Sequence, residues 1–88
     1  MMNRRVVVTG LGMVSPIGND VASSWKAALE GKSGIDRITA FDASAFGCQI
    51  AGEVKDFDAG KYLGVKEVHR FDRFVHFGVS AGIMALED

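Results

Sequence analysis

The C-terminal stretch predicts a helix that must be covered on nearly every side. From about Glu67 to the last residue the pattern is helical, and apolar side chains surround most of the helix. These are Phe71, Phe74, Val75, Phe77, Val79, Ile83, Met84 and Leu86. A helix that is apolar nearly all round is buried in a larger body. The chain has only 88 residues, and a domain of that size buries just ~60–65% of its unfolded surface. The sequence therefore predicts a portion of a larger fold.

Small residues on the same helix favour close contact with a neighbour. Gly78, Ala81, Gly82 and Ala85 share a face. A glycine inside a helix costs about 1 kcal/mol relative to alanine, so two of them indicate that close packing offsets the loss. The pattern reaches the last residue without the Gly, Asn or Pro that usually ends a helix. We therefore expect the chain to be cut from a longer protein.

The N-terminal half predicts a strand, a turn and an amphipathic helix. Arg5–Thr9 is a β-branched run without alternation, which is typical of a buried strand. Gly10–Gly18 is rich in turn residues, and Asn19 or Asp20 can cap a following helix. Gly31 stands where a left-handed helix cap is expected. The apolar stripe of this helix consists of Val21, Ala22, Trp25, Ala28 and Leu29.

The middle of the chain predicts a loop, a second strand and a helical turn. Residues 32–46 are expected to form a loop anchored by Ile35, Ile38 and Phe41. Residues 48–55 alternate, which predicts a strand with Cys48 and its alternate neighbours on a buried face. A short helical turn is expected at 61–64. Together these elements indicate an α/β fold, with residues 1–88 forming one incomplete unit.

Composition and charge exclude several classes of protein. The formal net charge of −1 argues against a nucleic-acid-binding surface. No apolar run reaches the ~18 residues of a membrane span, and the run that ends at Thr9 is too short for a signal peptide. The single cysteine, Cys48, has no partner within the chain for a disulfide. These features indicate a cytoplasmic protein.

Three motifs suggest chemistry but favour structural roles. Gly10–Ser15 nearly matches a dinucleotide-binding loop, yet Ser15 replaces the third glycine and the next helix starts too late to face a phosphate. A tight turn with close packing is the preferred interpretation. Cys48 is expected to be a buried apolar side chain and not a nucleophile. His69 and His76 lack the partners of a metal site, so we expect one surface histidine and one packed histidine. No catalytic residue, metal ligand or cofactor is predicted.

The densest basic stretch runs from Lys66 to Arg73. Lys66, Arg70 and Arg73 are spaced i, i+4 and i+7, on one side of the start of the predicted long helix. Cations at a helix N-terminus oppose the helix dipole at a cost of some tenths of a kcal/mol each. A cost without a local gain indicates an anionic partner, although a solvated face is the alternative.

Several segments, read in order, follow a familiar pattern. They are Arg4–Asn19, Trp25–Lys26, Gly31–Ile35, Phe41–Asp42, Ala51–Phe57 and Phe71–Phe74. With them the chain resembles, over nearly its whole length, the β-ketoacyl-acyl-carrier-protein synthases, the condensing enzymes of fatty-acid elongation. The opening, Arg4–Asn19, is the most specific part, and it does not separate fatty-acid from polyketide enzymes.

This resemblance implies the N-terminal portion of a thiolase-like fold with layered α-β-α-β-α organisation and two similar halves. It also implies a homodimer and a decarboxylative Claisen condensation between acyl and malonyl groups on acyl carrier protein. The family's cysteine nucleophile and two histidines would lie beyond Asp88, so the 88-residue chain by itself is expected to be inactive. Two alternatives are a chain-length-factor-like partner subunit and a polyketide ketosynthase. A nucleotide-binding module is a more remote one.

One functional region of the family falls inside the chain. The resemblance places part of a basic docking patch for the acidic carrier protein on the segment that includes Lys66, His69 and Arg70. Lys66 and Arg70 keep the basic character, and His69 stands where related enzymes often have Arg.

Overall fold

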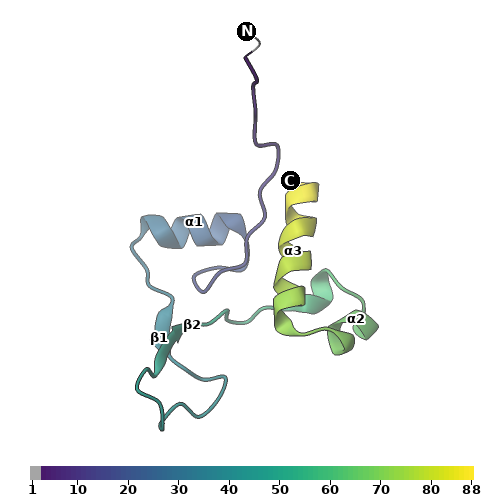
Figure 1. Ribbon diagram of the computed structural model, residues 1–88. Helices are drawn as coiled ribbons and strands as arrows, with labels where there is room; N and C mark the ends of the chain where they lie inside the picture. Colours follow the sequence, from purple (N-terminus) through teal and green to yellow (C-terminus); the bar gives the residue numbers. More distant parts are fainter. Residues whose placement is uncertain (1–2) are drawn as a thin grey trace.

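The structure is a computed structural model that describes residues 3–88. Met1 and Met2, with which the predicted unit begins, lie outside the described part. Helices and a small sheet alternate along an open chain (Figure 1). The elements, in order, are α1 (Val21–Leu29), β1 (Ile35–Arg37), β2 (Ile50–Gly52), the 3-10 turn η1 (Ala59–Lys61), α2 (Val65–Arg70) and α3 (Arg73–Glu87).

Helix α1 has the ends that the sequence predicts. The Asp20 carboxylate accepts a hydrogen bond from the Ser23 amide at 2.7 Å, which satisfies one of the free first-turn donors. Gly31 has φ +72°, the left-handed conformation expected just beyond a helix. The apolar stripe is exposed, however, because α1 buries only Ser24 and Ala27.

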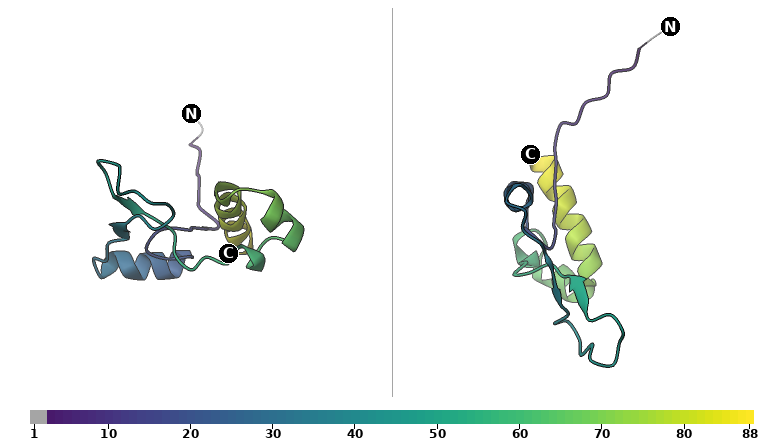
Figure 2. Two further views of the ribbon diagram at one scale, coloured as in Figure 1. Left: turned by 90° about the horizontal axis from the view of Figure 1, so that it is seen from below. Right: turned by 90° about the vertical axis from the view of Figure 1, so that its left-hand side faces the viewer.

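The predicted N-terminal strand is wrong. Residues 5–9 are assigned to no strand and pair with no other strand in the described part of the chain. The segment projects away from the other elements (Figures 1 and 2), and Val6 is 91% exposed. The β-branched composition favours an extended backbone, but a strand also needs a partner, and none of the described residues reaches it.

The predicted strand at 48–55 is shorter and more exposed than expected. Ile50–Gly52 forms β2, antiparallel to β1, with Ile35 opposite Gly52 and Arg37 opposite Ile50. Strand β1 lies within the segment predicted to be a loop. Cys48 and Ile50 are exposed, so the expectation of a buried face is wrong. A two-stranded sheet is marginal without a third strand or a covering helix, and nothing in the described chain covers this one.

The predicted long C-terminal helix is divided into two. Phe71, with φ −110° and ψ 152°, is extended and ends α2, and Asp72 precedes α3. The Asp72 carbonyl accepts bonds from the amides of Val75 and His76 at 3.1 and 3.2 Å, which starts the new helix. The helical turn expected at 61–64 occurs slightly earlier, as η1, where Asp58 Oδ1 accepts from the Gly60 amide at 2.9 Å.

The closest approach at any described glycine joins the Gly10–Gly12 segment to α3. The tight turn expected at Gly10–Ser15 forms later, where the Ser15 amide bonds to the Gly18 carbonyl at 2.8 Å. A Cβ atom at Gly10 or Gly12 would collide with the backbone carbonyl oxygens of Ala85 and Ala81, respectively. Leu11, between the two glycines, donates its amide to Asp88 Oδ2 at 3.0 Å. The small-residue face of α3 therefore receives a neighbour at Ala81 and Ala85. The close packing predicted at the two helix glycines is not found, because nothing lies within 4 Å of a Cβ placed at Gly78 or Gly82. The same contact confirms that Gly10 and Gly12 serve close packing.

Most of the apolar surface stays uncovered. The accessible surface is 7198 Å², against ~5,000 Å² expected for a compact chain of this mass. The radius of gyration is 16.4 Å, against ~12 Å for a compact domain of this length. Among residues 3–88, the buried apolar residues are Ala27, Ala43 and Ala59 alone. No helix within residues 3–88 is long and apolar enough to cross a membrane.

The contact of Gly12 with the Ala81 carbonyl predicts that adding one methyl group at Gly12 lowers the stability of the fold. Gly12→Ala should destabilise the full-length protein by about 1–3 kcal/mol, because a carbonyl oxygen of a helix cannot move aside as a flexible side chain can. The measurement is the thermal midpoint of unfolding. Gly47→Ala is the control, since nothing lies within 4 Å of a Cβ built there. Equal midpoints for both variants would contradict the close packing.

Candidate functional site

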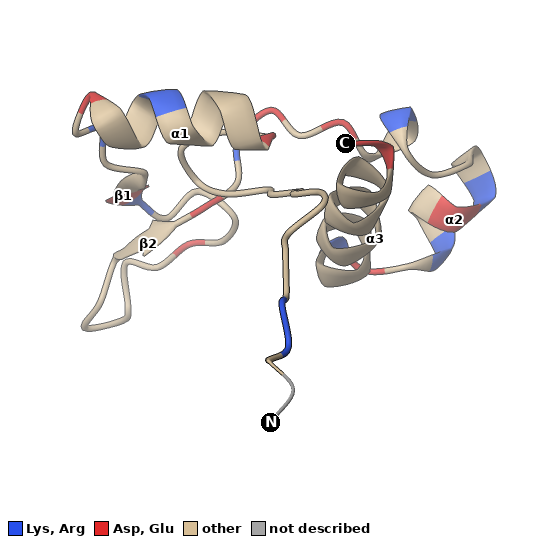
Figure 3. Cartoon of the chain, turned by 90° about the horizontal axis from the view of Figure 1, so that it is seen from above, with Lys and Arg blue, Asp and Glu red and all other residues tan. Residues whose placement is uncertain are grey.

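Helix α2 presents the predicted basic residues on a short, exposed helix. It follows Gly64, runs for six residues and buries none of its side chains. Lys66, His69 and Arg70 are all exposed. Figure 3 shows the basic positions of α2 at the edge of the molecule, away from α1 and the hairpin. The structure therefore brings the three predicted carrier-binding residues together on one element.

The division of the long helix changes the electrostatics of this site. Because α2 ends at Arg70, His69 and Arg70 lie in its last turn, where the negative end of the helix dipole favours a cation. The prediction that the cations oppose the dipole is therefore wrong for Arg70, and it holds for Lys66 and for Arg73, the first residue of α3. An anionic partner at α2 is therefore supported by the exposure and pairing of its side chains, and not by the dipole.

The charges of Lys66 and Arg70 are not neutralised locally. Neither side chain forms an ion pair or a hydrogen bond with another of the described residues, whereas Lys32 pairs with Glu30 at 3.1 Å. The Arg70 guanidinium lies 5.8 Å from the centroid of the Phe71 ring, which leaves its donors free. Two free cations on an exposed helix can bind an acidic surface without first breaking an internal pair.

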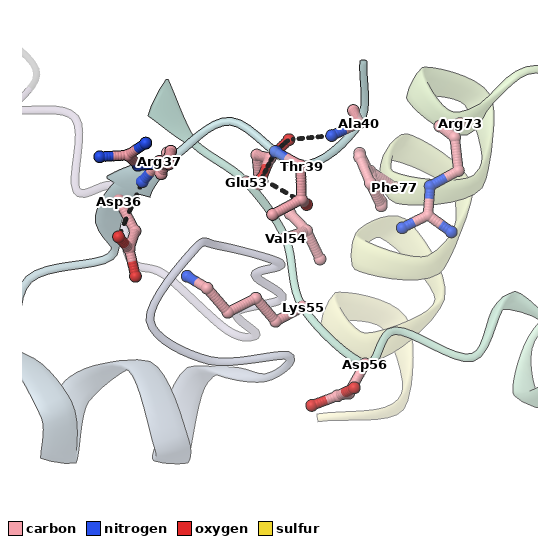
Figure 4. Close-up of a pocket in the computed structure, with 11 residues that line it drawn as sticks. Asp36, Arg37, Thr39, Ala40, Glu53, Val54, Lys55, Asp56, Arg73 and Phe77 are labelled. Atoms are coloured by element: carbon pink, nitrogen blue, oxygen red, sulfur yellow. Dashed lines mark hydrogen bonds between the residues drawn. The ribbon is translucent and has the colours of Figure 1, made fainter. Parts of the chain in front are cut away.

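Arg73 does not share this face. It is the first residue of α3, and its guanidinium lies 4.9 Å from the centroid of the Phe77 ring. Figure 4 shows Arg73 and Phe77 on one side of a groove of about 620 Å³, with residues of the hairpin on the other. The i, i+7 spacing of Lys66 and Arg73 places the two side chains on one face only if a single helix contains both. The helix breaks at Phe71, so Arg73 belongs to a different helix from Lys66.

Within this groove, Glu53 holds the segment that follows β1. Its carboxylate accepts bonds from the amides of Thr39 and Ala40, at 3.1 and 3.0 Å, and from Thr39 Oγ1 at 2.9 Å (Figure 4). The Ala40 amide, followed by the Thr39 amide and hydroxyl, lowers the pKa of Glu53 below its ordinary value. The sequence places Glu53 on the polar side of a predicted strand and gives no further signal of this role.

Lys55 is also engaged in holding the fold. Its Nζ donates to the carbonyl oxygens of Gly34 and Pro16 at 3.3 and 3.5 Å. The carboxylate of Glu53 and the ammonium of Lys55 are thus both occupied by backbone groups. These two charged residues therefore serve the loop connections.

The remaining candidates keep structural roles. Cys48 is an exposed free thiol, so the expectation that it is buried is wrong, and its Sγ lies 3.4 Å from the Ile50 carbonyl oxygen. His69 is exposed and His76 is buried, as predicted. No group of three potential metal ligands occurs within residues 3–88.

A second groove is almost wholly apolar. It has a volume of about 590 Å³ and lies between residues 11–17 and the predicted apolar stripe of α1. Leu11, Met13, Ile17, Trp25 and Ala28 contribute to its lining. The stripe is therefore a real apolar face, and the described chain leaves it open.

Comparisons with known proteins agree on one family. The family model for the β-ketoacyl synthase N-terminal domain matches residues 3–88. The chain is 56% identical over 88 residues to 3-oxoacyl-[acyl-carrier-protein] synthase 2 of Vibrio harveyi, with 100% of this chain and 21% of that protein covered. It is 53% identical over 85 residues to the protein of the same name from Synechocystis, with 97% of this chain and 20% of that protein covered.

A solved structure shows the same fold. It is described as the ishigamide ketosynthase/chain length factor, and it matches with a TM-score of 0.83 and 35% identity over 98% of this chain and 21% of that one. The chain belongs to the β-ketoacyl synthase family, as the N-terminal domain match shows. Its α/β fold is an incomplete portion of the thiolase-like ketosynthase fold, which confirms the predicted fold class. The chain spans about a fifth of the length of the curated relatives it matches.

The Glu53 contacts predict a local dependence on pH. A carboxyl group with a lowered pKa in the folded state stabilises that state above its unfolded pKa, and the effect is lost as pH falls through the folded pKa. Glu53→Gln should therefore weaken the protection of the Thr39 and Ala40 amides against hydrogen exchange near neutral pH. In the unsubstituted protein this protection should fall as acid protonates Glu53, and in the variant that fall should be absent. Asp36→Asn is the control, because among the described residues the Asp36 carboxylate accepts a hydrogen bond only from the amide of its neighbour Arg37. Unchanged exchange at both amides in Glu53→Gln would contradict the assignment.

Proposed function

We propose that this chain is the N-terminal part, residues 1–88, of the first thiolase-like half of a fatty-acid-elongating ketosynthase. The full-length enzyme would condense an acyl group with a malonyl group, both held on acyl carrier protein, by a decarboxylative Claisen reaction. The names of the curated relatives support this activity, because each is a 3-oxoacyl-[acyl-carrier-protein] synthase 2. The open groove along α1 supports the proposal that these residues are part of a larger domain, because its apolar lining is suited to being covered by further protein.

The bond-making groups would lie outside this chain. In the proposed reaction a cysteine at a helix N-terminus takes the acyl group as a thioester, since a thiolate is favoured there. Two histidines assist the loss of carbon dioxide from the malonyl group, and backbone amides stabilise the developing oxyanion. We place all of these residues beyond Asp88 and require no cofactor. Cys48 has no such setting, because it lies before a short exposed strand.

The contribution of this chain to the reaction would be the docking of the carrier protein. Lys66 and Arg70, with His69 between them, would face the acidic surface of the carrier. The observation that carries this proposal is that both cations are exposed on α2 and form no ion pair with any described residue. Surface cations that gain nothing internally are suited to steering an oppositely charged partner.

A chain-length-factor-like partner subunit is the second candidate. The similarity to the ishigamide ketosynthase/chain length factor favours this candidate, because the description of that structure names a chain length factor beside the ketosynthase. The higher identity to the curated synthases, 56% against 35%, favours the active enzyme. The sequence beyond Asp88 decides between them, because only the synthase needs the cysteine and the two histidines.

The assembly and location follow from the same proposal. A homodimer would cover part of the apolar surface that these residues leave open. A reducing, cytoplasmic location suits a chain whose one cysteine is a free thiol at the surface.

The docking proposal predicts a selective loss with carrier-bound substrate. Exposed ion pairs contribute only ~0.2–1 kcal/mol each, so one substitution should have a small effect. Lys66→Glu with Arg70→Glu adds repulsion and should slow association with the carrier about tenfold at low ionic strength, and less at high salt. Acylation by a small thioester without the carrier should stay nearly unchanged. The measurement compares both substrates at two salt concentrations in the full-length enzyme.

A matched control separates local from general charge effects. Lys26→Glu with Arg37→Glu changes the net charge equally, at exposed positions on α1 and β1. It should leave carrier binding near that of the unsubstituted enzyme. Equal loss on both substrates for the α2 variant would indicate a role in folding, and full retention would show that the patch is only a solvated face. Either result would refute the docking proposal.

A further inference from the structure

Helix α2 is held in place by few contacts of its own. It has six residues and buries no side chain. The amide of Phe71 bonds to the Glu67 carbonyl at 3.1 Å, which closes the last turn. The carbonyl groups that follow Glu67 have no intrahelical donor, because every helix leaves its last carbonyls unsatisfied. Something outside α2 must therefore fix its position relative to the rest of the chain.

A histidine of α3 supplies one of the missing donors. His76 Nε2 lies 3.0 Å from the carbonyl oxygen of Val68, in the second half of α2. A carbonyl oxygen can only accept, so the ring must hold its proton on Nε2 to make this bond. The bond joins the two helices across the break at Phe71 and Asp72. The side chain that makes it is buried, with 6% exposure.

Helix α3 is a suitable platform for this bond. Its Ala81 and Ala85 carbonyl groups pack directly against Gly12 and Gly10, respectively, and Asp88, which caps its C-terminus, bonds to Leu11. Ser80, one turn after His76, is fully buried, so this face of α3 is the most enclosed part of the molecule. A donor fixed on α3 can therefore hold a neighbouring helix in a defined position.

We propose that His76 is a positioning residue for carrier docking, which holds α2 through the Val68 carbonyl so that Lys66 and Arg70 face the carrier together. This inference rests on the proposed function of α2. His76 touches neither substrate nor carrier. It acts by reducing the number of orientations that α2 can adopt, so that less freedom is lost when the carrier binds.

The test compares two substitutions of similar shape in the full-length enzyme. His76→Met fills the buried site with an apolar side chain and removes the donor. His76→Gln has nearly the same length and keeps an N–H donor for the Val68 carbonyl. One neutral hydrogen bond corresponds to an equilibrium effect of about two- to tenfold. His76→Met should weaken carrier binding by that factor, and His76→Gln should restore most of it.

A third variant controls for general disturbance of this face. Ser80→Ala alters the other buried polar side chain of α3, which forms no bond to α2. It should bind the carrier as the unsubstituted enzyme does. The rate with a small carrier-free thioester should stay within about twofold for all three variants. The reason is that a change in the orientation of α2 is independent of the reacting groups, which we place elsewhere in the enzyme.

The outcomes separate this inference from the docking proposal. If Lys66→Glu with Arg70→Glu weakens carrier binding but His76→Met and His76→Gln behave alike, the positioning role is wrong and docking stands. If the double reversal has no effect, docking itself fails. If His76→Met loses activity equally on both substrates, His76 supports the fold in general and the inference is overturned. Should His76→Met not fold, faster exchange of the Phe71 amide in His76→Gln than in Ser80→Ala would also overturn it.

Discussion

The contact between the Gly10–Gly12 segment and α3 organises the other elements of the chain. Gly10 and Gly12 allow the N-terminal segment to reach the backbone of α3 at Ala85 and Ala81, a distance that no side chain would permit. This contact joins residues near the two ends of the chain, and the Leu11–Asp88 bond reinforces it. With α3 fixed in this way, η1 and α2 are arranged around its beginning, and His76 can bond to α2.

The same arrangement leaves the apolar surfaces of the other elements open. Val6, Trp25 and Leu29 remain exposed, and an apolar groove runs beside α1. A surface of this kind marks a region that another part of a protein covers. The basic helix α2 differs, because its exposed residues include unpaired cations. The molecule thus has two kinds of surface, an apolar one suited to permanent burial and a charged one suited to a transient partner.

The sequence predicts local features more reliably than pairing and burial. The cap at Asp20 and the left-handed Gly31 follow from backbone chemistry within a few residues, and the structure has both. The close packing of Gly12 is long-range, because its neighbour is Ala81, and the glycines alone indicate it in the sequence. The strand at Arg5–Thr9 and the buried face near Cys48 depend on partners that the described residues do not supply. The break at Phe71 has no Gly or Pro to mark it. Glu53 and His76 were missed as bonding residues, because their partners are backbone groups that carry no sequence signal.

The central claim is that the glycine contact on α3 organises this chain but does not bury enough surface to stabilise it alone. Thermal unfolding of the isolated 88-residue chain, followed by circular dichroism with sedimentation analysis of the same sample, tests this most directly. We predict a broad, non-cooperative loss of helical signal, or association through the exposed apolar faces. A sharp cooperative transition in a monomeric species would contradict the account.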